Sequence, residues 1–550
     1  MKSNDLPPGA QAKRGYADLH EHLAELEKRG LLLRIERPVD KDAELHPLVR
    51  WQFVGGMDEA ERKAFLFNHI VDGRGRKYDI PVVVGAIAAN RAIYSVGMAA
   101  PVERIQAKWD DAIAHPVPPR VVESAPCHEV VLTGEDLVGE GKGLARLPIP
   151  ISTPGFDSAP TLTATNVVTK DPETGVQNMG TYRAALKATD RLVVRMATRV
   201  GGAGGYLHYV KHQKRGDKTM PCAIVLGCPP YVAFMGPQKL PVGVDELEVA
   251  GGLAGAPINV VRAKTVDLMV PAEAEVVIEG LIDTEWCEPE APFGESHGHV
   301  ALEEFNMPMR VTAITMRRDP VIPSYISQVA PSESSVIKRV AYEPLFLAHL
   351  RDTLGIRGVK RVSLHEPLTG LLRVTVVSFE KGVARTEVWR ALRGAAFFKG
   401  DMGKITIAVT DDIEPDNADA LLWSMAYRMN PVEDVQTLPH RGQGHGPKRE
   451  HGNEEDSTLL VDATMKSDMP PLALPKREYM ERAKEIWEEL GLPKLRPQSP
   501  WHGYSLGDWV SQWDDAAKRA VDGRWEENGR ISEKQRRKGV KPETKFRPGE

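Results

Sequence analysis

The sequence predicts an α/β protein with α+β character, divided into several domains around a β-rich middle. The chain has 550 residues, and a single hydrophobic core stops growing at about 250–300 residues. Helical and strand-like patterns alternate near the start of the chain and again after residue 330, which is typical of α/β domains. Between residues 125 and 320, short β-branched runs broken by Gly and Pro predict a sandwich or a barrel.

The N-terminal segment predicts a small α/β domain. Leucines at helical spacing that end before Gly30 predict a helix over 18–28. Three prolines within 114–124 mark a boundary, so we assign the first domain to 1–115 and the second to 116–325. Further elements expected in the first domain are a strand over 31–36, a helix around 44–51 and a buried strand over 81–87.

The central domain is expected to be built almost entirely of strands. Its apolar runs are short and β-branched, and turn residues separate them at close intervals. The runs lie at 128–132, 161–169, 191–196, 222–227, 258–263, 268–272, 275–280 and 309–317.

A second α/β domain is expected over 326–470, followed by a tail over 471–550. The charged tail should carry a helix over 477–490 and contact a neighbouring subunit or stay disordered. The predicted elements of the second α/β domain are helices at 334–355 and 418–429 and strands at 359–366, 371–380 and 404–413.

The segment 440–456 contains no apolar residue and predicts an exposed loop. Its histidines could bind a metal ion, but their irregular spacing favours a solvated loop. They are His440, His445 and His451.

Composition argues against several classes of protein. There are 76 acidic and 71 basic residues, which gives a net charge of −5 and no electrostatic footprint for nucleic acid. No apolar run approaches the ~18 residues that cross a bilayer, and the polar N-terminus is not a secretory signal. We therefore expect a cytoplasmic protein with no membrane and no nucleic-acid partner. The four cysteines, Cys127, Cys222, Cys228 and Cys287, are too few for a disulfide scaffold and are expected to be small buried hydrophobes.

The densest ionisable cluster is the segment 283–299, which holds five acids and no Lys or Arg. Its E-A-P-F-G-E core contains Glu290 and Glu295, and its prolines and glycine predict a loop. Such a loop can turn both carboxylates toward one cavity, where like charge and burial would raise one pKa as general acid catalysis requires. Composition alone slightly favours the other interpretation, a solvated acidic turn.

A second candidate is the hexapeptide N-M-G-T-Y-R at 178–183. Asn178 offers an oxygen to a cation, Gly180 allows close approach to a ligand, and Arg183 suits a phosphate or a carboxylate. Alone this pattern is weak, because Asn-x-Gly is also a common turn. Glu246 or Glu248 could complete a hard-cation site with Asn178.

These segments, taken in order, resemble the UbiD family of decarboxylases, whose cofactor is prenylated FMN. The resemblance runs from about residue 16 to 470. Several ordered blocks are far more specific than one motif. They favour the interpretation of the segment 283–299 as a functional loop over that of a solvated turn. The resemblance implies a UbiD-like fold with a central split β-barrel that binds the flavin. The blocks are LHEHLAELEKRGLLLRIERPVD, NMGTYR, VDELEVAGGLAGAPINVVRAKTVDLMVPAEAEVVIEGLID, EPEAPFGESHG, KITIAVTDDIEPDNADALLWSMAYRMNP and VDATMK.

The resemblance also implies roles for individual residues. Arg183, Glu290 and Glu295 match the family's catalytic Glu-Arg-Glu network. Glu295 would donate the proton that replaces CO₂, Glu290 would hold Arg183, and Arg183 would orient the substrate carboxylate. Asn178 and Glu246 match ligands of a divalent ion, Mn²⁺ or Mg²⁺, that ties the flavin phosphate to the protein, with K⁺ close by. The implied cofactor-binding set is Asn178, Gly180, Thr181, Tyr182, Arg183, Arg199, Glu246 and Lys404.

This chain departs from the family pattern at two positions. Arg199 stands where many relatives have a histidine as third metal ligand, so it would contact the phosphate directly. His208 is an alternative ligand, although a core or surface histidine is the more common case. Ala291 replaces a usual glycine before Pro292, which could narrow the pocket without abolishing the chemistry.

The implied activity is that of a carboxy-lyase: reversible, non-oxidative decarboxylation of an aromatic, heteroaromatic or α,β-unsaturated acid. The expected partners are that acid, CO₂, a flavin prenyltransferase that supplies the cofactor, and further copies of the chain in a dimer or hexamer. Two alternatives are a subunit of a multi-subunit carboxylase and a flavin-binding oxidoreductase on the same scaffold. Pocket shape is expected to depend on 327–339 and on the segment around Leu438.

Overall fold

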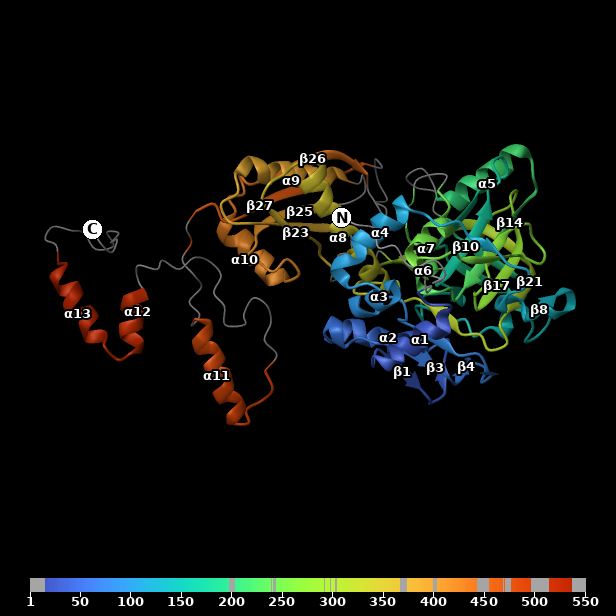
Figure 1. The fold of residues 1–550 in the computed structure, drawn as a ribbon, viewed down its shortest axis with the longest axis horizontal. Helices are drawn as coiled ribbons and strands as arrows, with labels where there is room; N and C mark the ends of the chain where they lie inside the picture. Colours follow the sequence, from blue (N-terminus) through green and yellow to red (C-terminus); the bar gives the residue numbers. More distant parts are fainter. Residues whose placement is uncertain are drawn as a thin grey trace, which may run out of the picture.

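The chain folds into an N-terminal α/β domain, a central β-barrel, a C-terminal α/β domain and a set of tail helices (Figure 1). This computed structural model describes residues 15–196, 203–238, 240, 244–290, 292–296, 298–301, 304–366, 373–398, 403–442, 455–467, 469, 476–495 and 514–536. The barrel lies at one end, the N-terminal domain beside it, and the tail helices at the opposite end (Figure 1). The predicted fold class is confirmed.

The N-terminal sheet has the strand order β1-β3-β6-β22. Its last strand, β22, comes from residues that we had assigned to the central domain, and it pairs in parallel with β6. Asp18 caps α1 by accepting a hydrogen bond from the backbone N–H of Glu21 at 2.9 Å. The elements are α1 Leu19–Lys28, β1 Leu32–Ile35, β2 Val39–Asp40, α2 Leu45–Val54, β3 Ala64–Phe67, β4 Ile70–Val71, β5 Lys77–Tyr78, β6 Val82–Val84 and β22 Ile322–Ser324.

The central barrel is built on a mainly antiparallel ten-stranded sheet. Its main path runs β11-β10-β14-β17-β21-β13-β12-β9, and β8 and β18 both pair with the long strand β21. The strands are β8 Val130–Thr133, β9 Thr161–Leu162, β10 Thr165–Lys170, β11 Gln177–Gly180, β12 Ala184–Ala188, β13 Arg191–Val194, β14 Thr219–Leu226, β17 Val276–Asp283, β18 Glu288–Glu290 and β21 Glu304–Met316.

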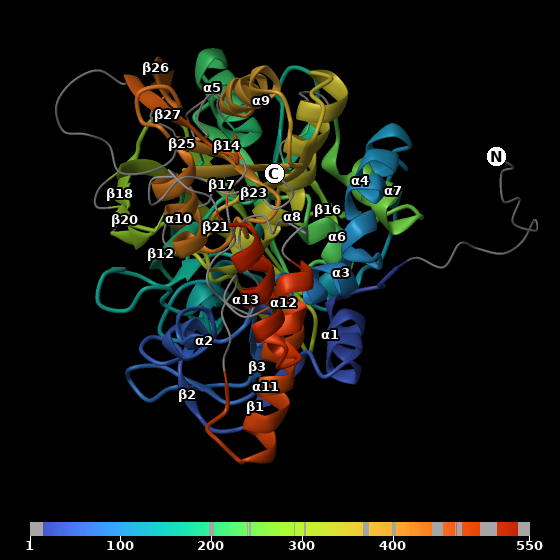
Figure 2. The same cartoon turned by 90° about the vertical axis from the view of Figure 1, so that its left-hand side faces the viewer.

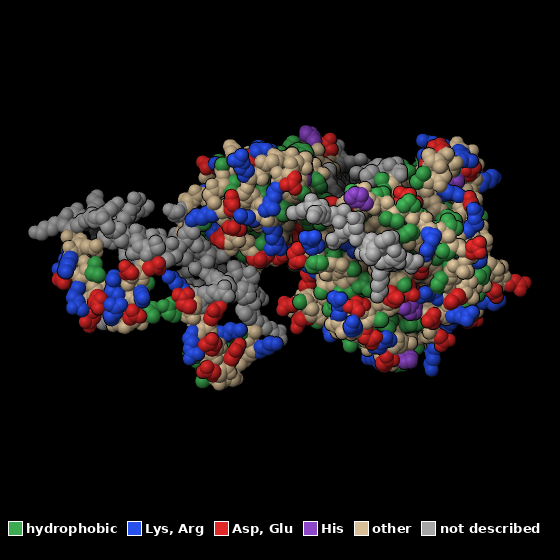
Figure 3. Space-filling view, in the orientation of Figure 1, with side chains coloured by type: hydrophobic (Ala, Val, Ile, Leu, Met, Phe, Trp, Pro, Cys, Tyr) green, Lys and Arg blue, Asp and Glu red, His purple; other side chains and the backbone are tan. Residues whose placement is uncertain are grey.

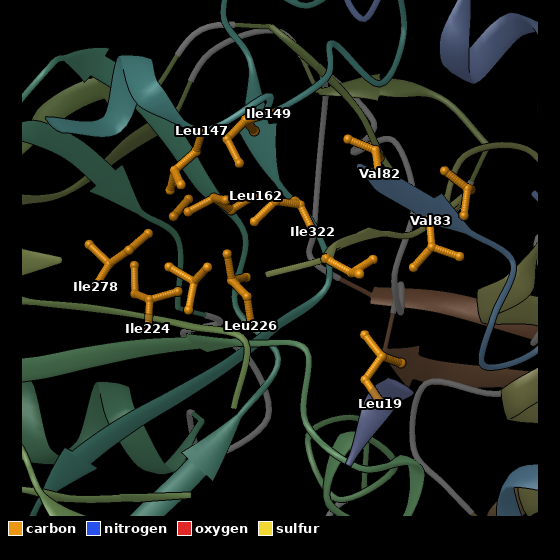
Figure 4. Close-up of a cluster of buried hydrophobic side chains, with 14 of the residues drawn as sticks. Leu19, Val82, Val83, Leu147, Ile149, Leu162, Ile224, Leu226, Ile278 and Ile322 are labelled. Atoms are coloured by element: carbon orange, nitrogen blue, oxygen red, sulfur yellow. The ribbon is translucent and has the colours of Figure 1, made fainter. Parts of the chain in front are cut away.

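The barrel and the N-terminal domain share one hydrophobic core. Leu19 and Val82 of the N-terminal domain belong to the same buried cluster as Leu162, Ile224 and Ile278 of the barrel (Figure 4). Apolar side chains from both domains are therefore buried against one another, which stabilises the relative placement of the two domains. The N-terminal domain is continuous with the barrel rather than joined to it by a linker.

Helices cover the barrel, and sequence periodicity missed several of them. α7 starts at Glu246 with Asp245 as its cap, and it packs on α4. α5 packs on β10 and β11 and was not predicted. The helices and the smaller strands are α3 Arg91–Met98, α4 Ile105–Ala114, α5 Gly204–Arg215, α6 Pro230–Ala233, α7 Glu246–Ala254, β7 Arg120–Val121, β15 Asn259–Arg262, β16 Met269–Pro271, β19 Phe293–Gly294 and β20 Val300–Ala301.

The C-terminal domain is a five-stranded sheet of order β23-β24-β25-β27-β26 with helices packed on it. The segment 440–456 is not a loop throughout, because residues up to 442 belong to β26 and residues from 455 belong to β27. The rest of that segment, with His445 and His451, lies outside the described residues. The elements are α8 Glu333–Ala348, β23 Val359–Leu364, β24 Val374–Phe379, α9 Arg385–Phe398, β25 Ile405–Thr410, α10 Ala418–Arg428, β26 Val435–Gly442 and β27 Glu455–Ala463.

The tail forms α11 (Arg477–Glu489), α12 (Asp514–Val521) and α13 (Trp525–Lys534), which lie apart from the C-terminal domain in Figure 1 and in front of the rest of the molecule in Figure 2. Among all helices of the described ranges, none combines the length and apolar character that crossing a bilayer requires. Three of the four cysteines are buried as expected, whereas Cys287 is exposed.

Candidate active site

Arg183 stands between β11 and β12 and reaches the segment that follows β17. Its Nε and Nη2 donate to the two oxygens of Glu290 at 2.7 and 2.8 Å. Glu290 ends β18, a strand that we had expected to be part of a loop, and its backbone is fixed by pairing with β21. Asn306 of β21 donates a further hydrogen bond to Glu290 at 2.8 Å. Glu290 is thus locked by three donors.

Glu295 contacts the same arginine from another direction. Nη1 of Arg183 donates to Oε1 of Glu295, and Nε of Arg195 lies 3.6 Å from that oxygen. The two carboxylates, five residues apart in the sequence, therefore meet at one guanidinium. The structure brings Arg183, Glu290 and Glu295, the three residues that the sequence singled out, into one cluster.

The cluster is almost completely removed from water. The side chains of Arg183, Glu290 and Glu295 are 9%, 2% and 9% exposed. Burial opposes the charge on Arg183, but its hydrogen bonds to Glu290 and its attraction to both carboxylates raise the pKa of Arg183 above the ordinary value. Arg183 also stacks 4.6 Å from the centre of the Phe293 ring. Because water is largely excluded from this site, the charges of Arg183, Glu290 and Glu295 interact with little screening by solvent.

The turn that carries Glu295 is fixed by its neighbours. The N–H of Gly294 donates to Asp157 at 2.9 Å, and the N–H of Glu295 donates to the carbonyl of His299 at 3.0 Å. A Cβ on Gly294 would lie 2.2 Å from Oγ1 of Thr153, so a side chain does not fit there. The close approach of this turn to Thr153 therefore requires glycine.

A second cluster joins β11 to the start of α7. Nδ2 of Asn178 donates to Glu246 at 2.5 Å, and the N–H of Met179 donates to the other oxygen of Glu246 at 3.0 Å. Oδ1 of Asn178 accepts from the hydroxyl of Tyr182 at 3.3 Å. Burial raises the pKa of Glu246 to about 7.

This second cluster fits a hard cation and a phosphate-bearing cofactor. Asn178 and Glu246 offer the oxygen donors that Mg²⁺ and Mn²⁺ prefer, and a nearby cation would relieve the buried carboxylate. Oγ1 of Thr181 is buried with no hydrogen-bond partner in the described structure, so it can donate to a ligand. A Cβ on Gly204 would lie 2.4 Å from Cγ of Asn178, so the glycine brings the start of α5 close to this cluster.

The remaining predicted residues lie elsewhere or outside the described ranges. Lys404 precedes β25 in the C-terminal domain and pairs with Asp456. His208 is buried on α5, and its Nδ1 lies 2.9 Å from Oγ1 of Thr169, which places it in the core rather than at Glu246. Arg199, like Ala291, lies outside the described residues.

Sequence reasoning missed several residues that hold the site. Asn306 sits diagonally opposite Glu290 on the paired strand, a relation that appears only once the register is known. Arg195 follows β13 in the sequence RLVVRM, where its charge at the end of an apolar strand was the available signal. Asp157 belongs to a turn with no motif of its own.

Two protein-family models match the chain. Residues 120–329 match the 3-octaprenyl-4-hydroxybenzoate carboxy-lyase Rift-related domain of UbiD. Residues 336–463 match the corresponding C-terminal domain. The matches are consecutive, and together they span more than half of the 550 residues.

Solved structures with the same fold include UbiD-class enzymes. HmfF from Pelotomaculum thermopropionicum, in complex with FMN, is 29% identical with a TM-score of 0.71 over 82% of this chain and 95% of its own. Vanillic acid decarboxylase from Sedimentibacter hydroxybenzoicus is 24% identical, with a TM-score of 0.68 over 86% of this chain and 100% of its own.

A 3,4-dihydroxybenzoic acid decarboxylase from Enterobacter cloacae is 22% identical, with a TM-score of 0.70 over 85% of this chain and 100% of its own. At identities below 25% the last two structures show the fold alone. Family matches, fold and buried Glu-Arg-Glu cluster agree: the chain belongs to the UbiD family and is a carboxy-lyase.

Proposed function

We propose that the chain is a prenylated-FMN-dependent decarboxylase that reversibly removes CO₂ from an aromatic, heteroaromatic or α,β-unsaturated acid. The observation that carries this proposal is the buried cluster of Arg183, Glu290 and Glu295. Structures of HmfF contain FMN or prenylated FMN, which supports a flavin in this chain as well.

Residues of the second cluster would hold the cofactor. Asn178 and Glu246 would bind the divalent ion, Mn²⁺ or Mg²⁺, beside the flavin phosphate, with K⁺ nearby. Gly180, Thr181 and Tyr182 would line the cofactor, and the partnerless hydroxyl of Thr181 would donate to it. When bound, prenylated FMN supplies the sink for the electron pair left by CO₂. Contacts of Arg199 and Lys404 with the phosphate remain part of this proposal.

Arg183 would orient the substrate. A guanidinium presents donors in a rigid plane that fits a carboxylate, and the grip of Glu290 on Nε and Nη2 fixes that plane. Nη1 of Arg183, which donates to Glu295, would then also donate to the substrate carboxylate. Because the cluster is dry, the substrate carboxylate would lose its hydration shell on binding, which strengthens its contact with Arg183.

Glu295 would supply the proton. After CO₂ leaves, the carbon that carried it needs one proton, and a carboxylic acid at Glu295 can give it directly. The carboxylate left behind is stabilised by Arg183 and by Arg195, 3.6 Å away. In the reverse direction the same carboxylate would take the proton from that carbon. Glu290, held by three donors, would keep Arg183 in place.

The cellular setting follows from the same proposal. A flavin prenyltransferase would supply the cofactor, and the enzyme would act in the cytoplasm as a homo-oligomer, a dimer or a hexamer. Intact Arg183, Glu290 and Glu295 favour an active enzyme over a non-catalytic subunit of a larger carboxylase.

Co-expression with a flavin prenyltransferase and anaerobic purification test the proposal. We expect protein with an altered flavin spectrum that releases CO₂ from at least one member of a panel of aryl, heteroaryl and acrylic acids. Colourless protein with no activity on the panel would contradict it. The variant Arg183→Lys provides a comparison, since it keeps the positive charge but loses the two-pronged contact with Glu290, and we expect it to show no activity on the panel.

A further inference from the structure

A cleft of about 780 Å³ opens between the N-terminal domain and the barrel. Residues of α1, β1 and β5 line it, together with residues at the ends of β8 and β21. None of the residues of the candidate active site lines it. Its volume lies within the range of about 300–1,000 Å³ that is usual for small-molecule sites.

A closed ionic network fixes the floor of the cleft. The Glu275 side chain is fully buried, and its Oε2 lies 3.0 Å from Nε2 of His20. Arg317 donates to Asp18 at 2.9 and 3.0 Å and lies 3.5 Å from Glu275. These groups satisfy one another, so they need no ligand, and they hold His20 and Arg317 in the wall of the cleft.

Four other cationic side chains of the lining have no carboxylate as an ion-pair partner in the part of the chain that the structure describes. Arg76, Lys77, Arg146 and Arg318 line the cleft, and within the described ranges none of their charged side-chain groups forms an ion pair with a carboxylate. The backbone N–H groups of Arg76 and Arg318 donate to the side chains of Asp72 and Glu129. Arg34, by contrast, is neutralised by Glu27 at 2.6 and 2.8 Å. The acids of the lining that remain are Asp79 and Asp319, so the cleft is positive in a chain whose net charge is −5.

Arg76 is held ready for a ligand. Its Nη2 donates to the carbonyl of Gly141 at 3.2 Å, and its guanidinium lies 4.9 Å from the centre of the Tyr78 ring. Asp72 shapes the turn by accepting from the N–H of Arg76 at 3.0 Å and from the hydroxyl of Tyr78 at 3.1 Å. Because the Arg76 side chain is already fixed in this way, it loses little conformational entropy when its remaining N–H groups bind an anion.

Part of the lining is apolar. Such a surface suits the organic part of a ligand, and it distinguishes the cleft from a purely ionic patch. The apolar residues include Leu23, Ala24, Leu66, Ile80, Val130 and Met316.

We propose that this cleft binds a phosphorylated small molecule. A diphosphate group would contact Arg76, Lys77, Arg146 and Arg318, and the organic part would lie on the apolar lining. The four cations come from three separate segments of the chain, so an anion with charge on two phosphates meets them better than one with a single charged group. Phosphate oxygens also match the donor geometry of arginine.

Calorimetric titration of the full chain tests this site. The probes are pyrophosphate, ADP as an organic diphosphate, and succinate as a dicarboxylate. The site variant is Arg76→Gln with Arg146→Gln. The control is Arg74→Gln with Lys142→Gln, which removes two charges from neighbouring positions of the same two loops, outside the cleft lining. Because Arg76 also packs on Tyr78, Arg318→Gln serves as a second site variant.

We expect saturable binding of pyrophosphate with a Kd below about 1 mM, weakened at least tenfold in the site variants and less than twofold in the control. Equal or tighter binding of ADP supports the proposal, and tighter binding shows that the apolar lining contributes. The absence of saturable binding, equal loss in the control, or succinate binding as tight as pyrophosphate would overturn it. None of these readouts depends on decarboxylase activity.

Discussion

The variant Glu290→Gln tests whether the Glu-Arg pair is a buried anchor. Glu290 is 2% exposed and accepts two hydrogen bonds from Arg183 and one from Asn306. A glutamine has one acceptor oxygen, and its amide N–H₂ would face a guanidinium donor. Breaking a buried ion pair in this way costs about 3–5 kcal/mol.

Glu288, two residues earlier on the same strand, provides the matched control. It pairs with Arg191, but the two side chains are 27% and 39% exposed. An exposed pair is worth about 0–1 kcal/mol. Both substitutions remove one charge from β18, so the difference between them isolates burial.

Urea unfolding of the cofactor-free protein, run in parallel for both variants, measures the free energy of unfolding. We expect Glu290→Gln to lower it by at least 2 kcal/mol more than Glu288→Gln, an estimate that takes the low end of the buried cost. In holoenzyme, Glu290→Gln should also lower kcat by about 100-fold, because Arg183 is no longer fixed. Equal effects of the two variants on stability would refute the anchor, whatever the activity shows.

Three further predictions concern a loop, a cation and a buried acid. Arg50→Gln removes hydrogen bonds to the carbonyls of Val329 and Pro331 and to the side chain of Gln328. Because this loop packs on Gly294, we expect kcat of the holoenzyme to fall about tenfold with flavin content unchanged. The exposed control Arg37→Gln should change neither quantity, and equal losses of kcat in the two variants would contradict this role of Arg50. Glu246→Gln should weaken Mn²⁺ binding at least tenfold by calorimetry, and unchanged affinity, or the same loss in Glu248→Gln on the same helix, would remove Glu246 from the site. Burial raises the pKa of Glu333 to about 7 from 4.5, so the folded state favours the protonated acid and its contribution to stability is lost as pH rises from about 4.5 to 7. Stability of the wild type relative to Glu333→Gln should therefore fall by roughly 2–3 kcal/mol between pH 5 and pH 8, and a difference independent of pH would show that Glu333 titrates normally.

Much of the fold followed from periodicity. The helix α1 was predicted close to its observed bounds, because its apolar residues recur with helical spacing. The β-branched runs at 161–169, 222–227 and 275–280 fall on β9 and β10, on β14 and on β17, although their ends differ by up to four residues. α7 was missed because it is rich in small residues and buried on several sides, which leaves no polar face to give a helical pattern. β22 was not predicted: its residues fall within the range assigned to the central domain, yet it pairs with β6 of the N-terminal sheet, and pairing between distant segments is not visible locally.

The site was predicted as a set of residues but not as a geometry. Ordered motifs pointed to Arg183, Glu290 and Glu295, and the structure brings them together. Their supports, Asn306 and Arg195, are set by strand register and could not be read from spacing. The cationic cleft left no trace in the composition, because the overall charge is negative and its cations are scattered along the chain.

The role of Glu295 is tested most directly by exchange of solvent deuterium into the product. The measurement compares wild-type holoenzyme with Glu295→Gln, both loaded with prenylated FMN and matched for flavin content. We expect the wild type to exchange deuterium at the carbon that carried CO₂ and the variant to bind flavin normally with no exchange and no turnover. Exchange retained in Glu295→Gln would contradict the assignment of Glu295 as the proton donor.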